Sequence, residues 1–281
     1  MRPVITVAEV VGVLDALYPR STRASWDAVG PVCGHPEAEV RLIGYAIDPT
    51  TAVVDEAIAR GADLLVTHHP LYLRGTSTVY ADSAKGALVH RLIESGCALV
   101  VAHTNADIAR HGVSEALAAA LGLVDAEPLV PDDRAALGPD ELGSGRIGRL
   151  AQPMTLRDFA AHASRSLPST PAGIRVGGDL DRVVRVVAVA GGAGDAYLDA
   201  ATSAGADAYV TADLRHHYAT EHLAGGGPAL LDVGHWASEW PWLPVVAQVV
   251  ADRLARLDGG DTVGSYVSAI VTDPWTLHLA R

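Results

Sequence analysis

Two adjacent histidines, His68 and His69, follow a short apolar run and stand directly before Pro70. A β-strand points successive side chains to opposite faces, so neighbouring imidazoles can reach one site only where the chain leaves the sheet, and Pro70 marks such an exit. Imidazole is the commonest transition-metal ligand in proteins. The pair therefore indicates a metal site at a strand end, although a single histidine there is more often a hydrogen-bonded structural residue.

Two further histidines each precede an acidic residue by four positions: His103 with Asp107, and His235 with Glu239. Side chains four residues apart share one face when the intervening turn is helical. Histidine with carboxylate is the ligand set of Zn, Fe or Mn rather than of Mg or Ca, which prefer oxygen ligands throughout. Four imidazoles and two carboxylates are enough for two divalent transition-metal ions.

The elements that must position these residues alternate between strands and helices. Apolar runs of strand length cover Val40 to Ile47, Ala62 to Val66 and Ala98 to Ala102, and helices are predicted between them at Thr51 to Arg60 and Ser83 to Glu94. This alternation is typical of βαβ units and predicts an α/β fold with mainly parallel or mixed sheets covered by helices. The carboxyl ends of the strands then meet at one edge, where ligands bind in such sheets.

An internal repeat relates two parts of the chain. Aligning residues 41–67 with residues 185–211 matches Gly61-Ala62-Asp63 with Gly205-Ala206-Asp207, and Val66-Thr67 with Val210-Thr211. In each part the next apolar run leads to a histidine with an acid four residues later. We therefore predict two related α/β halves, with the metal site between them at the strand carboxyl ends.

A polar stretch from Leu129 to Gly145 interrupts the alternation. We predict a first α/β half over residues 1–124 with the His-His-Pro motif, a linker and short connecting segment over 125–182, and a second half over 183–281 with the Gly-His-x-x-Ser-Glu motif. The second half has Ala212-Asp213 where the first has its histidine pair. We expect an asymmetric site, anchored by the pair and closed by the other half.

Composition narrows the class of protein. The 281 residues are 49% hydrophobic, but no apolar run approaches the roughly 20 residues that a membrane-spanning helix needs. The N-terminus lacks the pattern of a secretory signal, so we expect a cytoplasmic protein without membrane attachment. A formal charge of −12 and a single lysine, Lys85, argue against nucleic-acid binding, because phosphate contacts need clustered basic residues.

Three glycines, Gly191, Gly192 and Gly194, stand between a predicted strand and a predicted helix. Backbone N–H groups in such a place can cradle a phosphate or another anion, and a plain tight turn explains the glycines equally well. The chain has no Walker motif, and these glycines do not form a complete Gly-x-Gly-x-x-Gly, so nucleotide binding there by those routes is not supported. Trp26 and Trp236 are most simply packing residues around the site.

Five motifs also occur along the chain in a familiar order: Ser25-Trp26-Asp27-Ala28-Val29-Gly30, Thr67-His68-His69-Pro70-Leu71, His103-Thr104-Asn105-Ala106-Asp107, Gly191-Gly192-Ala193-Gly194 and Gly234-His235-Trp236-Ala237-Ser238-Glu239. The chain thereby resembles the NIF-three-like (YbgI-type) dinuclear metal-centre family, often described as type 2 GTP cyclohydrolase I. The resemblance covers nearly the whole chain. Its His-His-Pro and Gly-His-x-x-Ser-Glu motifs are specific in combination.

The resemblance implies roles for individual residues and for the assembly. The implied ligands of two metals are His68, His69, Asp107, His235 and Glu239. His103 would be an inner or outer partner of these ligands, and His217 would line the pocket. A toroidal homohexamer is also implied. The chain departs from the family at Thr211-Ala212-Asp213, where the usual Thr-Gly-Glu or Thr-Gly-Asp has a glycine that permits close backbone approach.

The expected activity is metal-dependent hydrolysis of the GTP cyclohydrolase I type 2 kind. Two divalent ions would generate a bridging hydroxide near neutral pH, and His103 or His217 would shuttle protons. The substrate would be a small anion or a nucleotide. The alternative is a non-catalytic metal-binding scaffold, metallochaperone or regulatory protein with the same ligands but a closed, saturated site.

Overall fold

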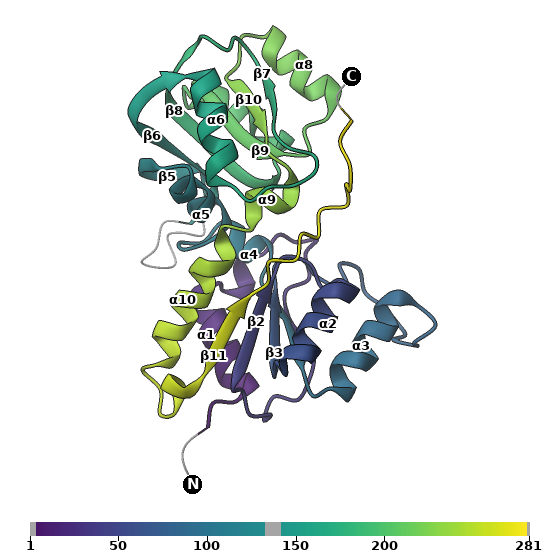
Figure 1. Cartoon of the computed structure of the whole chain (residues 1–281). Coiled ribbons are helices and arrows are strands. Elements are labelled where there is room, and N and C mark those ends of the chain that lie inside the picture. Colours follow the sequence, from purple (N-terminus) through teal and green to yellow (C-terminus); the bar gives the residue numbers. More distant parts are fainter. Residues whose placement is uncertain (1–3, 133–141, 280–281) are drawn as a thin grey trace. The chain divides into compact units, whose positions relative to one another are not determined.

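The structure, a computed structural model, describes residues 4–132 and 142–279. The chain divides into two compact units, each with its own sheet (Figure 1). Unit 1 contains residues 1–106 and 243–272, and unit 2 contains residues 107–242 and 273–281. The longer segment of unit 2, residues 107–242, is therefore inserted into the sequence of unit 1. Among the described residues, no helix combines the length and apolar character needed to cross a membrane.

Unit 1 is built on a five-stranded sheet in the order β1-β4-β3-β2-β11. Only β1 runs antiparallel to its neighbour; the other pairs are parallel. The strands are β1 (Gly30–Cys33), β2 (Leu42–Ala46), β3 (Leu64–Thr67), β4 (Ala98–Val101) and β11 (Gly264–Val267). The helices are α1 (Val7–Leu17), α2 (Thr51–Arg60), α3 (Ala84–Glu94) and, from its second residue, α10 (Trp242–Leu254).

The helices of unit 1 begin where the sequence supplies caps. Thr6 and Glu9 form a reciprocal capping box at the start of α1, and the side chain of Thr50 caps α2. The helix α2 ends at Gly61 in the left-handed conformation, which glycine adopts without strain. Apolar side chains of α2 and α3 pack against those of β3 and β4, so all residues of these two strands are buried. This core fixes where the strands end.

Unit 2 carries a six-stranded mixed sheet in the order β5-β6-β8-β9-β10-β7. The central strands β8, β9 and β10 are parallel, and the outer strands pair antiparallel. The strands are β5 (Leu123–Pro131), β6 (Gly143–Thr155), β7 (Arg175–Gly177), β8 (Val183–Ala193), β9 (Ala208–Ala212) and β10 (Ala229–Asp232). The helices are α5 (Val113–Ala120), α6 (Leu156–Ser166), α7 (Leu198–Ser203), α8 (His216–Ala224) and α9 (His235–Glu239).

Two separate cores hold the sheet of unit 2. The larger packs α5 and α6 against the sheet and includes Leu117, Phe159 and Val187. The smaller packs α7 and the region of α8 against the sheet and includes Leu198 and Tyr209. The two sheets with their helices confirm the predicted α/β fold with two halves.

The segment 125–182, which we expected to connect the halves, contributes β6, α6, β7 and most of β5 to unit 2. Within the stretch predicted as a polar linker, residues 129–131 belong to β5 and residues 143–145 to β6. Residues 133–141 lie outside the described residues.

Candidate metal centre

The strand β3 ends at Thr67, and the histidine pair follows at once. The backbone N–H of His68 donates to Ala46 and that of His69 donates to Ile47, so the chain still follows β2 as it leaves the sheet. The rings of the pair lie with centroids 4.9 Å apart and tilted by 44°. His68 is fully buried and His69 is partly exposed. Both imidazoles therefore lie close together at the end of β3.

A third imidazole joins the pair from the end of the neighbouring strand β4. The ring centroid of His103 lies 5.0 Å from that of His68 and 5.3 Å from that of His69. Each of the three residues offers a nitrogen that lies within 4.8 Å of the corresponding nitrogen of the other two. Adjacent parallel strands thus bring three imidazoles together, and we call His68, His69 and His103 the histidine group.

Every ring of the histidine group is fixed through its Nδ1 atom. Nδ1 of His69 lies 2.7 Å from Oδ1 of Asp48, and Nδ1 of His103 lies 2.8 Å from Oδ1 of Asp27. Nδ1 of His68 lies 2.9 Å from the carbonyl oxygen of Ala102. An acceptor on Nδ1 selects the tautomer whose Nε2 carries the lone pair, which is how metal-binding histidines are commonly held. The donor chemistry of this group fits a transition metal.

Asp27 connects the histidine group to the loop before β1. One carboxylate oxygen accepts from the N–H of Ala28 at 2.7 Å, and the other accepts from the N–H of Thr104 at 3.0 Å. Burial alone would raise the pKa of Asp27, but the hydrogen bonds from His103 and Thr104 and the charge of His103 hold that pKa well below its usual range. Asp27 is therefore a stable anion behind the ring of His103.

Unit 2 contains a cluster of one imidazole and two carboxylates. Nε2 of His235 lies 3.0 Å from Oε1 of Glu239 within α9, as the four-residue spacing predicted, and Nδ1 lies 2.7 Å from Oδ2 of Asp213. Burial would lower the pKa of His235, but the charge of Glu239 and the hydrogen bonds to both acids raise it to about 11. We call His235, Glu239 and Asp213 the carboxylate group.

The end of β8 passes directly behind the carboxylate group. A Cβ atom on Gly192 would stand 2.5 Å from Oε1 of Glu239 and 3.1 Å from Nε2 of His235, so only glycine leaves room there. The N–H of Gly192 donates to Oγ of Ser238 at 2.8 Å, and the N–H of Gly194 donates to the carbonyl of Ala212. These N–H groups, which we considered for an anion cradle, are engaged inside unit 2.

The other residues predicted for the site occupy different surroundings. Asp107 ends the short helix α4 (Thr104–Asp107), is partly buried, and begins unit 2. His217 lies exposed in the first turn of α8, where its ring meets that of His216 edge to face. Ala212 is an ordinary buried residue of β9, and the positive φ of 55° falls on Asp213.

The two tryptophans expected to pack around the site differ sharply. Trp236 is 4% exposed and packs against Trp240 in unit 2. Trp26 is 60% exposed, so it does not pack as expected, although its ring centroid lies 5.9 Å from that of His103.

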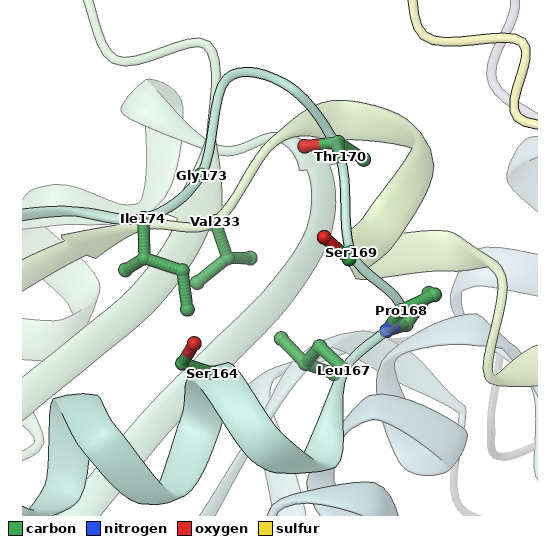
Figure 2. Close-up of a pocket in the computed structure, with 8 residues that line it drawn as sticks. All are labelled: Ser164, Leu167, Pro168, Ser169, Thr170, Gly173, Ile174 and Val233. Atoms are coloured by element: carbon green, nitrogen blue, oxygen red, sulfur yellow. The ribbon is translucent and has the colours of Figure 1, made fainter. Parts of the chain in front are cut away.

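A small pocket in unit 2 lies close in sequence to His235 but does not match a substrate (Figure 2). Its volume is about 50 Å³, which is room for water molecules only. Figure 2 shows Ser169 and Thr170 on one side of the pocket, Ile174 and Val233 on the other, and Ser164 and Leu167 below them.

Comparison with known proteins identifies the family of the chain. The model of the family Duf34/NIF3 (NGG1p interacting factor 3) matches residues 5–274. The chain belongs to the Duf34/NIF3 family. The histidine group and the carboxylate group are therefore features of a Duf34/NIF3 protein, and the predicted resemblance is confirmed.

Relatives of this Duf34/NIF3 chain carry a name that refers to an activity. A Streptomyces coelicolor protein named "GTP cyclohydrolase 1 type 2 homolog" is 52% identical over 274 residues, which cover 98% of this chain and 95% of the relative. A Mycobacterium tuberculosis protein of the same name is 37% identical, with 97% of each chain covered. That alignment extends over 375 residues, so the mycobacterial relative contains insertions that this chain lacks.

Solved structures support the fold. A Bacillus cereus protein related to NIF3 has a TM-score of 0.86 at 27% identity, covering 98% of this chain and 99% of its own. The Staphylococcus aureus protein SA1388 has the same TM-score at 28% identity, covering 98% of this chain and 99% of its own.

Sequence reasoning missed the acids that hold the imidazoles. Asp48 follows the end of β2, so its place at the same sheet edge as His69 was a usable signal. Asp27 lies 76 residues from His103 in sequence, and no spacing rule connects them. Asp213 occupies the repeat position of the histidine pair, where it supports His235 from the next strand instead of acting in the pair's place.

Proposed function

We propose that this Duf34/NIF3 protein is a dinuclear metal-dependent hydrolase of the GTP cyclohydrolase 1 type 2 kind. One observation carries the proposal: all three imidazoles of the histidine group have Nδ1 fixed by an acceptor, and Nδ1 of His235 is fixed in the same way. This arrangement is typical of metal ligands, because the acceptor orients the ring and raises the basicity of Nε2. The name of the relatives supports the choice of reaction.

The donors divide between nitrogen and oxygen. His68, His69 and His103 would bind through Nε2, which suits Zn, Fe or Mn. His235 and Glu239 would add a nitrogen and a carboxylate, and Asp107 is a further carboxylate ligand in this proposal. When bound, the ions would lower the pKa of a coordinated water and stabilise charge that develops on the substrate.

The chain's own residues prepare this chemistry. Asp27 and Asp48 hold the rings of His103 and His69, and the anionic state of Asp27 is secured by its hydrogen bonds. Their negative charge also offsets the positive charge of ions held by neutral imidazoles. Glu239 is 3% exposed, so its carboxylate is kept from bulk water and would interact strongly with a cation.

The test combines metal content with turnover. Protein purified without chelator should contain close to two transition-metal ions per chain by elemental analysis and should hydrolyse GTP. His69→Ala should lose metal and activity together, because it removes a ligand. His90→Ala is the matched control, since His90 is exposed on α3 and should retain both.

The outcomes separate the proposal from its alternative. Fewer than one metal ion per chain in the native protein would refute the dinuclear centre. Two bound ions without turnover of GTP or of other nucleotides would reject the hydrolase and support a metal-binding scaffold or metallochaperone.

A further inference from the structure

Trp26 is an exposed aromatic residue beside the histidine group. Its side chain is 60% exposed, while its neighbour Asp27 is 8% exposed. Burying an indole is favourable by about 25 cal/mol for each Å² of apolar surface removed from water. A tryptophan that stays open beside a ligand cluster therefore forgoes stability that packing would give. Tryptophan is enriched at binding interfaces, because its ring is apolar while its N–H can still donate a hydrogen bond.

The exposure does not come from a frayed loop. The N–H of Asp27 donates to the carbonyl of Ala24 at 3.0 Å, and the N–H of Ala24 donates to Oγ1 of Thr104 at 2.9 Å. Nε of Arg23 donates to the carbonyl of Asp27 at 3.3 Å. The carboxylate of Asp27 is itself fixed to His103 and Thr104. The backbone on both sides of Trp26 is thus tied to the segment that carries His103.

The position of the indole defines what it can contact. Its ring centroid lies 5.9 Å from that of His103, and the two ring planes meet at 77°. The indole is therefore adjacent to one imidazole of the histidine group, and its surface is mostly open. Aromatic side chains presented in this way bind planar heteroaromatic rings by stacking, which contributes about 1–3 kcal/mol per base.

We propose that Trp26 is the stacking platform for a planar heteroaromatic ring, such as a nucleobase, of the substrate handled at the histidine group. This inference rests on the proposed function. It assigns to Trp26 recognition of the ring, while the metal ligands handle the reacting part. Because stacking requires no donor or acceptor pattern, Trp26 selects flat heterocycles as a class, and other groups must distinguish one base from another.

The experiment compares two probes that differ by the ring. Affinities of metal-loaded protein for GTP and for inorganic triphosphate are measured by calorimetry in the native chain, Trp26→Ala and Trp26→Phe. The native protein should prefer GTP. Trp26→Ala should weaken GTP binding by roughly 5- to 150-fold and leave triphosphate unchanged, since 1–3 kcal/mol corresponds to that range. Trp26→Phe should retain most of the preference.

Two controls separate recognition from packing and from metal binding. Trp275→Ala removes a tryptophan that is 66% exposed in unit 2 and should leave both affinities unchanged. Metal content is measured in each variant and should equal that of the native protein. Equal affinity of the native protein for both probes, or unchanged GTP affinity in Trp26→Ala, overturns the inference, and so does loss of metal in that variant. Stacking-dependent GTP binding without turnover would keep the role of Trp26 and refute the hydrolase.

Discussion

The two sequence-related strand ends, at β3 in unit 1 and β9 in unit 2, carry different chemistry. After β3 the chain supplies His68 and His69, and Nδ1 of each ring is fixed by the acceptor described above. After β9 it supplies Asp213, a carboxylate that binds Nδ1 of His235 while Glu239 lies at Nε2. In the histidine group a carboxylate therefore stands behind two of the three rings, those of His69 and His103, and in the carboxylate group one stands on each side of the His235 ring.

This difference teaches how one repeated scaffold can yield two kinds of ligand cluster. Neutral nitrogen donors give preference for transition metals, and a carboxylate adds charge that strengthens the attraction to any divalent ion. A repeat that kept histidines at both strand ends would lack that charge. The following predictions test the comparison, beginning with the largest expected effect.

The strongest test compares substitutions of His103 and His217, which the sequence suggested equally as proton shuttles. His103→Ala should lower the affinity for metal by at least about 100-fold, because losing even an outer partner of a ligand costs about 10- to 100-fold. His217→Ala should have no measurable effect, because His217 is exposed on α8. Calorimetric titration with Zn²⁺ or Mn²⁺ measures both. Equal metal affinities in the two variants would show that His103 takes no part in metal binding.

The acids behind the rings should differ in importance between the units. Asp27→Asn should weaken metal binding by about 10- to 100-fold, since the buried carboxylate that fixes His103 would lose its charge. Asp213→Asn should have a smaller effect, because the Asp213 side chain is 55% exposed and water can replace its contact. Metal titration of both variants decides the matter. A larger loss in Asp213→Asn would reverse the comparison.

The close approach of β8 to the carboxylate group can be tested with paired glycines. Gly192 and Gly205 both have positive φ, of 67° and 73°, but only Gly192 has neighbours within 4 Å of an added Cβ. Each substitution by alanine should destabilise the chain by about 1–2 kcal/mol from backbone strain. Gly192→Ala should also reduce metal content by displacing Glu239. Thermal unfolding and elemental analysis separate the two effects, and normal metal content in Gly192→Ala would contradict the predicted displacement.

The smallest expected effect is the slow labelling of Cys97 by a thiol reagent, which reports whether unit 1 stays folded in these variants. Burial, with smaller effects of Cys33 and Asp63, raises the pKa of Cys97 to about 12, so its reactive thiolate is scarce at pH 8 and increases only as the pH approaches that value. A thiol reagent at pH 8 should therefore label Cys33 before Cys97, and it should label Cys97 only after the protein unfolds. Fast labelling of Cys97 in a histidine variant would show that lost metal binding reflects unfolding.

The sequence was sufficient for the parts of the fold that depend on local pattern. The strand before His68 and the repeat of Gly-Ala-Asp are local signals, and they predicted the α/β halves and the histidine strand ends. The segment after residue 125 was harder because β6 is long and contains Gly143, Gly145 and Gly148, whose lack of side chains hides the alternation of a strand.

The site was predictable only where spacing encodes geometry. The pair of His235 and Glu239 followed from one helical turn, whereas the contact of Asp27 with His103 depends on how a loop folds back onto a distant strand. The exposure of Trp26 was equally hidden, since hydrophobic character alone indicates burial.

The insertion of unit 2 has a consequence for how the protein is made on the ribosome. The sheet of unit 1 is completed by β11, whose Gly264 pairs with Leu42, and Thr272 donates to Asp48 across 224 residues of sequence. Residues 107–242 of unit 2 are contiguous and are synthesised before β11 emerges. Unit 1 therefore cannot complete its sheet until β11 has been synthesised. During translation the edge of β2 remains unpaired and is open to non-native strand pairing.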